Sequence, residues 1–352
     1  LSGLQLNSSG VITIPVNSTY GTYIFSYSIC QANTTNCSTA SASICVNNGL
    51  NPGTGANGPI YDAVLEPDGD IIIVGNFQLY NGQSRNNIAR LKPDLSLDHT
   101  FDPNGVGFND VIYSVTFDLN NNIIVGGRFT GTSTGVAKRN FARVFANNGS
   151  LDYSFNTNNT FQYLNGDLPD IRCIRVLPDG KILAGGIFTG VNNSPNTAAL
   201  VRFTNGGTLA NFPSPPIVSG RVNDMYINPN GTIVVGGQFK VNTGNAHILI
   251  QIQGDGTIVP SFIPGSSALG QNPEVWGIAR TIDRYVVAGK FSSYNGVNAR
   301  NITKVSLTGV VDPLSVFNPG TSVDNTTLGI ESVAVDSNNK ILIGGEFNSY
   351  NG

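Results

Sequence analysis

The 352-residue chain has few of the residues on which helices, charged surfaces and most active sites depend. It contains one Met, one Trp, two His and four Glu, whereas Gly reaches 42. Because helix formers are scarce and turn formers are abundant, this composition predicts an all-β protein. Only 12 % of the residues are charged and the formal net charge is −3, so no basic surface is available for phosphates. Nucleic-acid binding is therefore not expected.

Long apolar runs and catalytic motifs are also missing. No stretch approaches the roughly eighteen apolar residues of a membrane-spanning helix. Neither His99 nor His247 has a Cys, His or carboxylate at the spacing of metal ligands. The sequence has no Gly-x-Ser-x-Gly elbow and no phosphate-binding Gly-rich loop. We therefore predict no membrane span, no metal, no cofactor and no catalytic residue.

What the chain does contain is one apolar hairpin strand repeated six times. Residues 122–129, 181–188, 232–239 and 340–347 each carry three apolar residues, Gly-Gly, one variable residue and Phe, and residues 70–77 and 284–291 are divergent copies. The closing residues, 51 to 59 positions apart, are Phe77, Phe129, Phe188, Phe239, Phe291 and Phe347. A period of this length with several short strands predicts a β-propeller of six four-stranded blades, with seven as the alternative.

Two further features recur in every complete repeat. A tight turn such as Pro178-Asp-Gly180 precedes the hairpin strand; it lacks the twelve-residue spacing of an EF-hand and indicates turn chemistry, not a metal site. A long polar side chain recurs in the third strand, at Arg90, Arg143, Arg202, Gln251 and Lys304. We interpret it as a structural ladder that binds carbonyls or the nearby Asp98 and Asp152. A ring of ligand-binding residues is the alternative.

The first 48 residues have no copy of the repeat and instead alternate apolar and polar residues as three strands do. Cys30 and Cys37 bracket a polar stretch between two of these strands. Such a hairpin geometry predicts a disulfide and an oxidising, extracellular setting. The alternative is that both are small buried residues. Cys45 and Cys173 lie in apolar alternation and are expected to be core thiols.

Two resemblances refine this picture. Residues 10–30 with Asn36-Cys-Ser-Thr-Ala40 resemble the closing strands of immunoglobulin-like repeats in giant secreted surface proteins of Bacteroidetes. Pro178-Asp-Gly-Lys-Ile-Leu-Ala-Gly-Gly-Ile-Phe188 and Asn86-Asn-Ile-Ala-Arg-Leu91 resemble the delta-60 repeat family of propeller-like proteins. The resemblances imply the end of an immunoglobulin-like β-sandwich at 1–48, a propeller at 49–352, and an extracellular or cell-surface location.

Propellers commonly bind ligands where the loops entering the innermost strands converge, at the mouth of the central channel. By this fold analogy, the candidate site consists of residues that differ from repeat to repeat: Tyr61, Tyr113, Arg172, Asn223, Trp276 and Glu331. Aromatic and polar side chains of this kind suit a carbohydrate or a protein ligand. The alternative is that they are ordinary solvated residues, and Trp276 in particular is also compatible with a plug in the channel.

Three functions remain open at this point. The first is a non-enzymatic adhesion or interaction module with a surface glycan or protein as its partner. The resemblance to surface proteins implies export through the type IX secretion translocon and a role in attachment or gliding. The second is a polysaccharide hydrolase or lyase that uses carboxylates such as Glu274 or Glu331. The third is a structural spacer.

Overall fold

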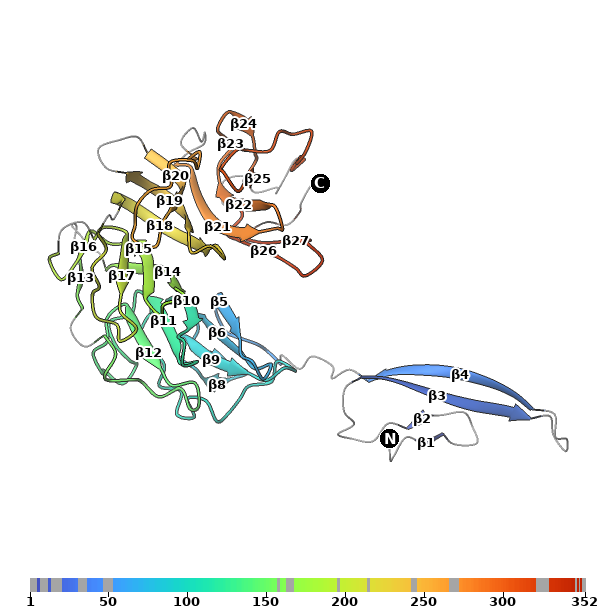
Figure 1. Ribbon diagram of the computed structural model, residues 1–352. Helices are drawn as coiled ribbons and strands as arrows, with labels where there is room; N and C mark the ends of the chain where they lie inside the picture. Colours follow the sequence, from blue (N-terminus) through green and yellow to red (C-terminus); the bar gives the residue numbers. More distant parts are fainter. Residues whose placement is uncertain are drawn as a thin grey trace. The chain divides into compact units, whose positions relative to one another are not determined.

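The computed structural model describes most of the chain, which divides into two compact units, one of Leu1–Gly53 with Pro93–Ser96 and one of Thr54–Lys92 and Leu97–Gly352 (Figure 1). The described residues are the backbone of four strands before residue 53, and then 53–156, 159–162, 168–194, 197–213, 216–241, 246–265, 272–320, 329–345, 347 and 349. Regular structure in this part of the chain is all strand. Among the same residues, none belongs to a helix that is long and apolar enough to cross a membrane.

The first unit contains two antiparallel pairs. Strand β1 (Gln5–Leu6) pairs with β2 (Ile12–Thr13), and β3 (Gly21–Cys30) pairs with β4 (Cys37–Val46). The register of the longer hairpin places Cys30 opposite Cys37. The side chains of Cys30, Cys37 and Cys45 lie outside the described residues, so the disulfide stays a prediction, as does the immunoglobulin-like assignment.

The second unit is a β-propeller built from successive antiparallel sheets, which we call the first to sixth blades (Figure 1). The first three blades are β5 (Ile60–Leu65), β6 (Ile71–Gly75) and β9 (Ile88–Leu91); β10 (Ile112–Phe117), β11 (Ile123–Gly127) and β12 (Phe141–Val144); and β14 (Asp170–Val176), β15 (Ile182–Ile187) and β17 (Leu200–Phe203). The next three are β18 (Ile217–Ile227), β19 (Ile233–Val241) and β20 (Ala246–Ile252); β21 (Glu274–Arg280), β22 (Arg284–Lys290) and β25 (Ile302–Ser306); and β26 (Ser332–Val335) with β27 (Ile341–Gly344).

Short two-stranded pairs accompany some blades. They are β7 (Leu79–Tyr80) with β8 (Gln83–Ser84), β13 (Phe161–Gln162) with β16 (Gly190–Val191), and β23 (Ser293–Tyr294) with β24 (Val297–Asn298). Strand β13 precedes the third blade in sequence but pairs with β16, which follows β15. In the third blade, this pairing connects the long segment before the first strand to the segment after the second strand.

The blades differ from the prediction of four strands each. In the described residues the complete sheets have three strands, and the fourth segment joins by single bridges such as Leu91 with Leu97 and Val144 with Leu151. The fourth segments contain Pro, which has no N–H for a ladder, or residues with positive φ such as Asp102 at 43° and Asn156 at 52°. The chain therefore turns away before a fourth strand can extend.

Apolar cores lie between successive blades. The first strands pack in order, β5 on β10, β10 on β14, β14 on β18, β18 on β21 and β21 on β26. Each interface buries residues of both blades; for example, Val74 of the first blade and Ile112 and Val125 of the second share one cluster. A blade has two apolar faces, so stacking against neighbours is what keeps these residues from water.

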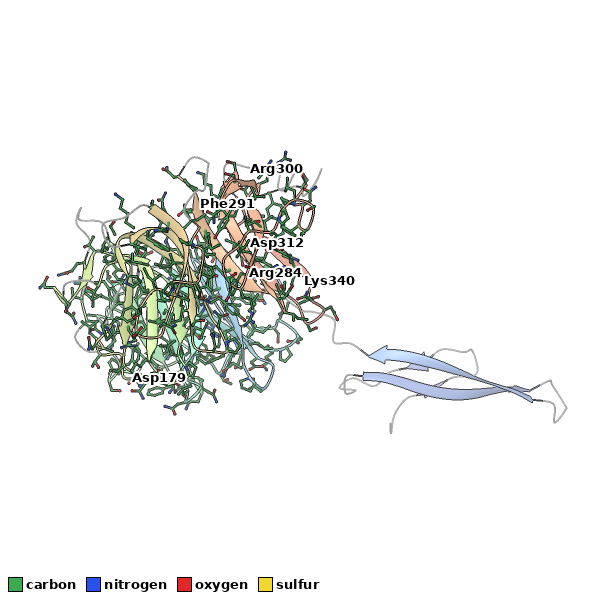
Figure 2. The ribbon with its side chains drawn as sticks, turned by 45° about the horizontal axis from the view of Figure 1, so that its top comes forward. Asp179, Arg284, Phe291, Arg300, Asp312 and Lys340 are labelled. Carbon is green, nitrogen blue, oxygen red and sulfur yellow. The ribbon has the colours of Figure 1, made fainter. Side chains whose placement is uncertain are left out.

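The predicted polar ladder is structural. The Nε of Arg90 donates to Asp98 at 2.7 Å, and Nη2 of Arg143 donates to Asp152 at 2.7 Å. Both guanidinium groups also lie over the phenylalanine of the fourth segment, Arg143 at 4.7 Å from the centre of the Phe155 ring. Arg202 donates to the carbonyl oxygens of Gly254 and Asn211. These contacts confirm the carbonyl and carboxylate partners. In the fifth blade, Arg284 pairs with Asp312 at 2.9 Å (Figure 2).

Candidate functional site

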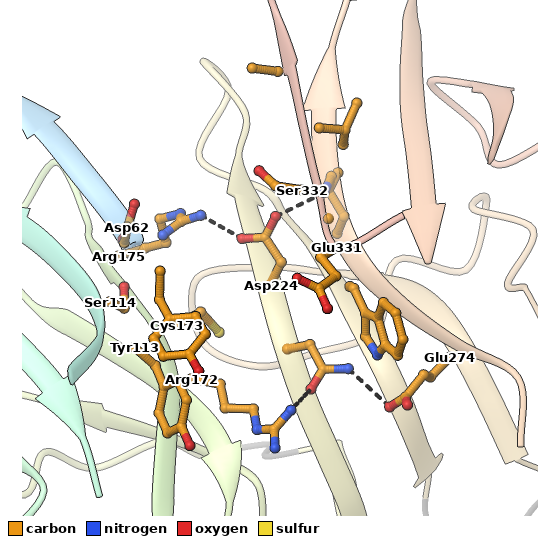
Figure 3. A pocket seen from close by; sticks show the side chains of 17 residues that line it. Asp62, Tyr113, Ser114, Arg172, Cys173, Arg175, Asp224, Glu274, Glu331 and Ser332 are labelled. Carbon is orange, nitrogen blue, oxygen red and sulfur yellow. Dashed lines mark hydrogen bonds and ion pairs between the residues drawn. The ribbon is translucent and has the colours of Figure 1, made fainter. Parts of the chain in front are cut away.

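A cavity of about 530 Å³ lies where the first strands of the blades converge (Figure 3). All six candidate residues line it: Tyr61, Tyr113, Arg172, Asn223, Trp276 and Glu331. They come from six blades and are separated by about fifty residues in the sequence. The fold therefore assembles one site from residues that are remote along the chain.

A β-bulge places five of these six side chains. In five blades the pairing of the first strand with the second skips one residue at this point, and the skipped residues are Tyr61, Tyr113, Arg172, Asn223 and Trp276. A bulged residue leaves the alternation of the strand, and its side chain is redirected. Glu331 immediately precedes β26 and is exposed.

A glycine lies opposite each of the five bulges and makes it possible. These glycines are Gly75, Gly127, Gly186, Gly237 and Gly289. In the second, third and fourth blades this glycine is the second residue of the Gly-Gly doublet. Gly126 and Gly127 pair with Ser114 and Ile112, the residues on either side of Tyr113. A Cβ on Gly127 would lie 2.1 Å from the carbonyl oxygen of Val111, and a Cβ on any of the other four glycines would meet a backbone carbonyl oxygen in the same way. The repeated scaffold motif therefore determines where the variable residue points.

Aromatic and cationic side chains meet on one side of the cavity. The rings of Tyr61 and Tyr113 are 5.3 Å apart between centroids, and the guanidinium carbon of Arg172 lies 5.6 Å from the centre of the Tyr113 ring. Tyr61 is 47 % exposed. Burial, and secondarily the Asp170 charge, raise the pKa of Tyr113, so its hydroxyl stays protonated near neutral pH. This side offers ring faces, a hydroxyl donor and a fixed cation.

A polar chain continues around the cavity. Nη1 of Arg172 lies 3.5 Å from Oδ1 of Asn223, and Nδ2 of Asn223 donates to Oε2 of Glu274 at 3.2 Å and to the Val275 carbonyl at 2.9 Å. Nη1 of Arg221 lies 3.7 Å from the same Glu274 oxygen. Asn223 and Glu274 are both buried. This chain joins three successive blades and fixes the orientation of Arg172.

The indole of Trp276 also lines the cavity. It packs against the backbone at Gly329, where a Cβ would lie 3.1 Å from Cζ3. Glycine at this position, with φ of 76°, lets the ring lie close to the chain. Trp276 is half-buried and shares the cavity with the other candidates. Its role, as ligand contact or as plug, stays a prediction.

A second polar group lies further along the same strands. Arg175 of β14 pairs with Oδ1 of Asp224 of β18 and donates through Nε to the Met225 carbonyl at 2.7 Å (Figure 3). The positive charge of Arg175 also acts on Asp62 of β5, where it lowers the pKa of the carboxyl group against the larger effect of burial. Burial raises the pKa of both Asp62 and Asp224, against the opposing effects of backbone donors and Arg175. The sequence analysis missed the pair of Arg175 and Asp224 because the two residues are 49 positions apart and no spacing links them.

The side chains just after the bulges link neighbouring blades. Oδ2 of Asp62 accepts from the Val115 N–H at 2.9 Å, Oγ of Ser114 accepts from the Ile174 N–H at 3.1 Å, and Oδ2 of Asp224 accepts from the Ile278 N–H at 2.8 Å. In each case a short polar side chain of one blade satisfies a backbone donor of another. A recurring Asp or Ser at this position was the available signal in the sequence. Cys173, at the same position, is buried, and burial raises the pKa of its thiol.

The family of the chain follows from its repeats. The model described as "Domain of unknown function (DUF5122) beta-propeller" matches residues 66–101, 120–155, 177–209, 228–262, 283–314 and 337–352, together more than half of the chain. The protein belongs to this β-propeller family. No curated protein matches the chain.

Solved structures with a similar chain path have diverse functions. One is the GH74 xyloglucanase from Xanthomonas campestris, with 10 % identity, TM-score 0.48 and coverage of 82 % of this chain and 44 % of that one. Another is the putative oxidoreductase (glucose dehydrogenase) from Thermus thermophilus, with 13 % identity, TM-score 0.46 and coverage of 83 % of this chain and 92 % of that one. A third is PorZ, a surface component of the type-IX secretion system of Porphyromonas gingivalis, with 12 % identity, TM-score 0.43 and coverage of 88 % of this chain and 42 % of that one. Likeness at this level bears on the chain path and not on activity.

Proposed function

We propose that the protein is a non-enzymatic interaction module that binds a glycan in the central cavity. The observation that carries this proposal is the set of bulged residues: each of five blades turns one side chain into a common cavity, and its identity changes from blade to blade while the scaffold repeats. Variation confined to converging positions is typical of a binding site on a rigid framework.

The cavity has the size and chemistry of a small-ligand site. Its volume of about 530 Å³ lies within the roughly 300–1,000 Å³ of known ligand pockets. Tyr61, Tyr113 and Trp276 offer aromatic faces for the apolar face of a sugar ring. Arg172 and the Asn223 amide supply directed donors for its hydroxyl or carboxylate groups. A concave site of this size favours a glycan end or branch over a flat protein surface.

The carboxylates of the cavity favour binding over catalysis. Each oxygen of Asp62 accepts a backbone hydrogen bond, from Ala63 and Val115, and each oxygen of Asp224 accepts one, from Met225 and Ile278. Glu274 accepts from Asn223. These groups hold blades together, whereas a general acid needs a proton that it can deliver to the substrate. The raised pKa values of Asp62 and Asp224 keep a hydrolase or lyase as the second candidate.

The setting that we propose is the bacterial cell surface. The resemblance of residues 10–40 to immunoglobulin-like surface repeats supports an extracellular location, export by the type IX translocon, and a role in attachment or gliding. Detection of the protein on intact cells by surface proteolysis would test the location independently of the ligand.

Glycan-array binding with two cavity variants tests the function. The first variant is Trp276→Ala, and the second combines Tyr61→Ala with Tyr113→Ala. Each removes aromatic faces from the cavity, and we expect each to weaken glycan binding by about tenfold or more. Tyr153→Ala, a truncation of a 66 % exposed tyrosine outside the cavity, is the matched control and should bind as the wild type does. Unchanged binding by both cavity variants would contradict the site.

Two other outcomes would replace the proposal. Turnover of a polysaccharide that is abolished by Glu274→Gln or Glu331→Gln would establish the hydrolase or lyase. A wild-type protein that neither binds nor cleaves any glycan, and that captures no surface protein, would leave the structural spacer.

A further inference from the structure

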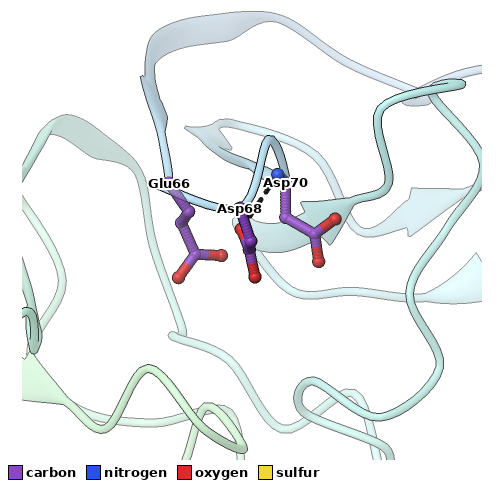
Figure 4. A group of neighbouring side chains, drawn as sticks. All are labelled: Glu66, Asp68 and Asp70. Carbon is purple, nitrogen blue, oxygen red and sulfur yellow. Dashed lines mark hydrogen bonds between the residues drawn. The ribbon is translucent and has the colours of Figure 1, made fainter.

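The turn of the first blade differs from the corresponding turns of the other blades in its charge. It reads Glu66-Pro-Asp68-Gly-Asp70, with a carboxylate at each alternate position (Figure 4). The same three positions hold Asp118, Asn120 and Asn122; Leu177, Asp179 and Lys181; Asn228, Asn230 and Thr232; and Asp336, Asn338 and Lys340 in four other blades, and the turn of the fifth blade is one residue shorter. Only the first turn therefore concentrates three negative charges.

The three carboxylates converge. One oxygen of each lies within 4.8 Å of the others, and all three side chains project to the same side of the turn (Figure 4). The backbone holds them there, because the Glu66 N–H donates to the Asp70 carbonyl at 2.8 Å and the Gly69 N–H donates to the Glu66 carbonyl at 3.0 Å. The cluster is thus part of an ordered turn and not a chance meeting of long side chains.

Glu66 is the independent sign that something is missing from this cluster. Its side chain is 9 % exposed, yet its Oε2 has no hydrogen-bond partner among the described residues. The nearest cation is Nη1 of Arg90 at 3.7 Å, which is beyond hydrogen-bond distance. That nitrogen donates instead to the Ala146 carbonyl at 2.7 Å, and the Nε of Arg90 donates to Asp98 at 2.7 Å. The same Nε also lies 3.7 Å from Oδ2 of Asp70. Arg90 is therefore one cation shared among Glu66, Asp70 and Asp98, and the hydrogen bonds of its Nη1 and Nε go to Ala146 and Asp98 and not to the cluster.

In the second blade the carboxylate at the position of Glu66 is Asp118, and the chain supplies hydrogen-bond donors to both of its oxygens. Oδ1 of Asp118 accepts from the N–H groups of Asn120 and Asn122, both at 2.8 Å. Its Oδ2 accepts from Nη1 of Arg143 at 3.0 Å and from the Asn122 amide at 3.2 Å. In the first blade the amides are replaced by Asp68 and Asp70, which supply further acceptors where donors are needed. A buried oxygen without a donor beside two like charges calls for a cation.

We propose that Glu66, Asp68 and Asp70 bind one Ca²⁺ ion on the turn of the first blade. Ca²⁺ binds carboxylate oxygens at roughly 2.3–2.6 Å, so two ligands of one ion lie at most about 5.2 Å apart, which the observed 4.8 Å satisfies. Alternate positions along a Gly-containing turn are also how calcium loops present their first ligands. The site has no Cys or His for Zn²⁺. The ion would balance the cluster and anchor β5 to β6.

Thermal unfolding of the chelator-treated full chain tests this site. With about 5 mM CaCl2 we expect Tm to rise by about 2–9 °C, given the roughly 10⁻⁴–10⁻³ M affinity of extracellular calcium sites. MgCl2 at the same concentration should give a clearly smaller rise. The variant D68N/D70N should show no calcium shift; it keeps the fold because Asn120 and Asn122 occupy these positions in the second blade. The matched control Asp179→Asn removes a carboxylate from the third-blade turn and should keep the full shift.

Calorimetric titration of CaCl2 into the same proteins gives a second readout. One ion per chain is expected for the wild type and for Asp179→Asn, and none for D68N/D70N. An equal Tm shift in D68N/D70N, an equal shift with NaCl at matched ionic strength, or no binding heat in the wild type at millimolar Ca²⁺ would each overturn the proposal.

Discussion

Two sets of arginine–carboxylate contacts in the propeller behave oppositely. In the polar ladder, burial would raise the pKa values of Asp98 and Asp152, but hydrogen bonds from Thr100, Ser154 and the ladder arginines outweigh it and lower them. In the cavity, burial prevails and raises the pKa values of Asp62 and Asp224 despite Arg175. The ladder carboxylates are stabilised as anions, whereas those of the cavity are not.

The difference separates scaffold from site. The ladder position recurs in every complete blade. Its side chains bind carboxylates, carbonyls or hydroxyls in the first four blades, and Lys304 of the fifth lies over the Phe317 ring. The bulged residues of the cavity change along the chain, and they meet only because the blades stack. Repetition therefore marks residues that stabilise a blade, and departure from repetition marks residues that are free to serve a ligand. The predictions below test this separation.

The largest effect is expected in the ladder. Arg143→Ala leaves Asp118 and Asp152, both almost fully buried, without their cation, and should lower the free energy of unfolding by about 3–5 kcal/mol. Urea unfolding measures this change. Arg139→Ala, at an exposed arginine four residues earlier, is the control and should change stability by less than about 0.5 kcal/mol. Equal effects of the two substitutions would refute a structural ladder.

The glycine doublet should be the next most sensitive feature. A Cβ at Gly126 would lie 2.5 Å from side-chain carbons of Ile171 and Ile174 in the next blade. Gly126→Ala is therefore expected to cost about 1–3 kcal/mol in urea unfolding through overpacking. Gly254→Ala, where a Cβ meets nothing within 4 Å, is the control. A neutral Gly126→Ala would show that the blades are not closely packed there.

The pH dependence of stability should distinguish the two sets of carboxylates. Above the ordinary pKa of 3.8, Asp62 and Asp224 hold protons in the folded state that the unfolded chain has lost, so they make stability fall as pH rises through their folded pKa values. Asp98 and Asp152 act below 3.8, where stability is lost as pH falls through their lowered folded pKa values. Urea unfolding from about pH 2.5 to 7 measures both.

Single substitutions assign these two pH ranges. Asp224→Asn should flatten the slope above 3.8 and leave the acid limb unchanged, whereas Asp98→Asn should do the reverse. A change in the same limb for both variants would show that the ladder and the cavity do not differ in the way described.

The smallest effect on stability is expected at the cavity surface. Tyr61→Ala removes a 47 % exposed ring that contacts Tyr113, and should lower the free energy of unfolding by no more than about 1 kcal/mol. Glycan binding should nevertheless weaken. A large loss of stability, measured by urea unfolding, would mean that Tyr61 belongs to the scaffold instead.

Much of the fold was predictable because the strands and turns of each blade are determined by residues within one repeat. The apolar runs ending in Gly-Gly-x-Phe predicted the second strands, and the recurring Arg90 and Arg143 predicted contacts with Asp98 and Asp152, which the structure confirms. The fourth strand was wrong, because single bridges and positive φ values end the pairing there. The periodic signal could not distinguish a strand from a segment that touches the sheet once.

The candidate site was predictable only in part. Fold analogy selected the six positions that line the cavity, but no sequence pattern indicated that five of them are bulged. The pair of Arg175 and Asp224, 49 residues apart, carries no spacing signal. The acidic turn of Glu66, Asp68 and Asp70 was visible in the sequence, yet it was interpreted with the other turns. Its distinction is the lack of a donor at Glu66, which only the packing of Arg90 reveals.

The sequence alone determined the repeating unit: its period, its strands, its turns and the glycine doublet, all of which depend on neighbours within one blade. The tertiary structure decided what the doublet is for. Its missing side chains accommodate a bulge in one strand and the packing of the next blade, and so direct an unrepeated residue into the cavity. The bulged residues meet because blades that are far apart along the chain stack on one another. A pattern within one repeat therefore does not predict which side chains share the cavity.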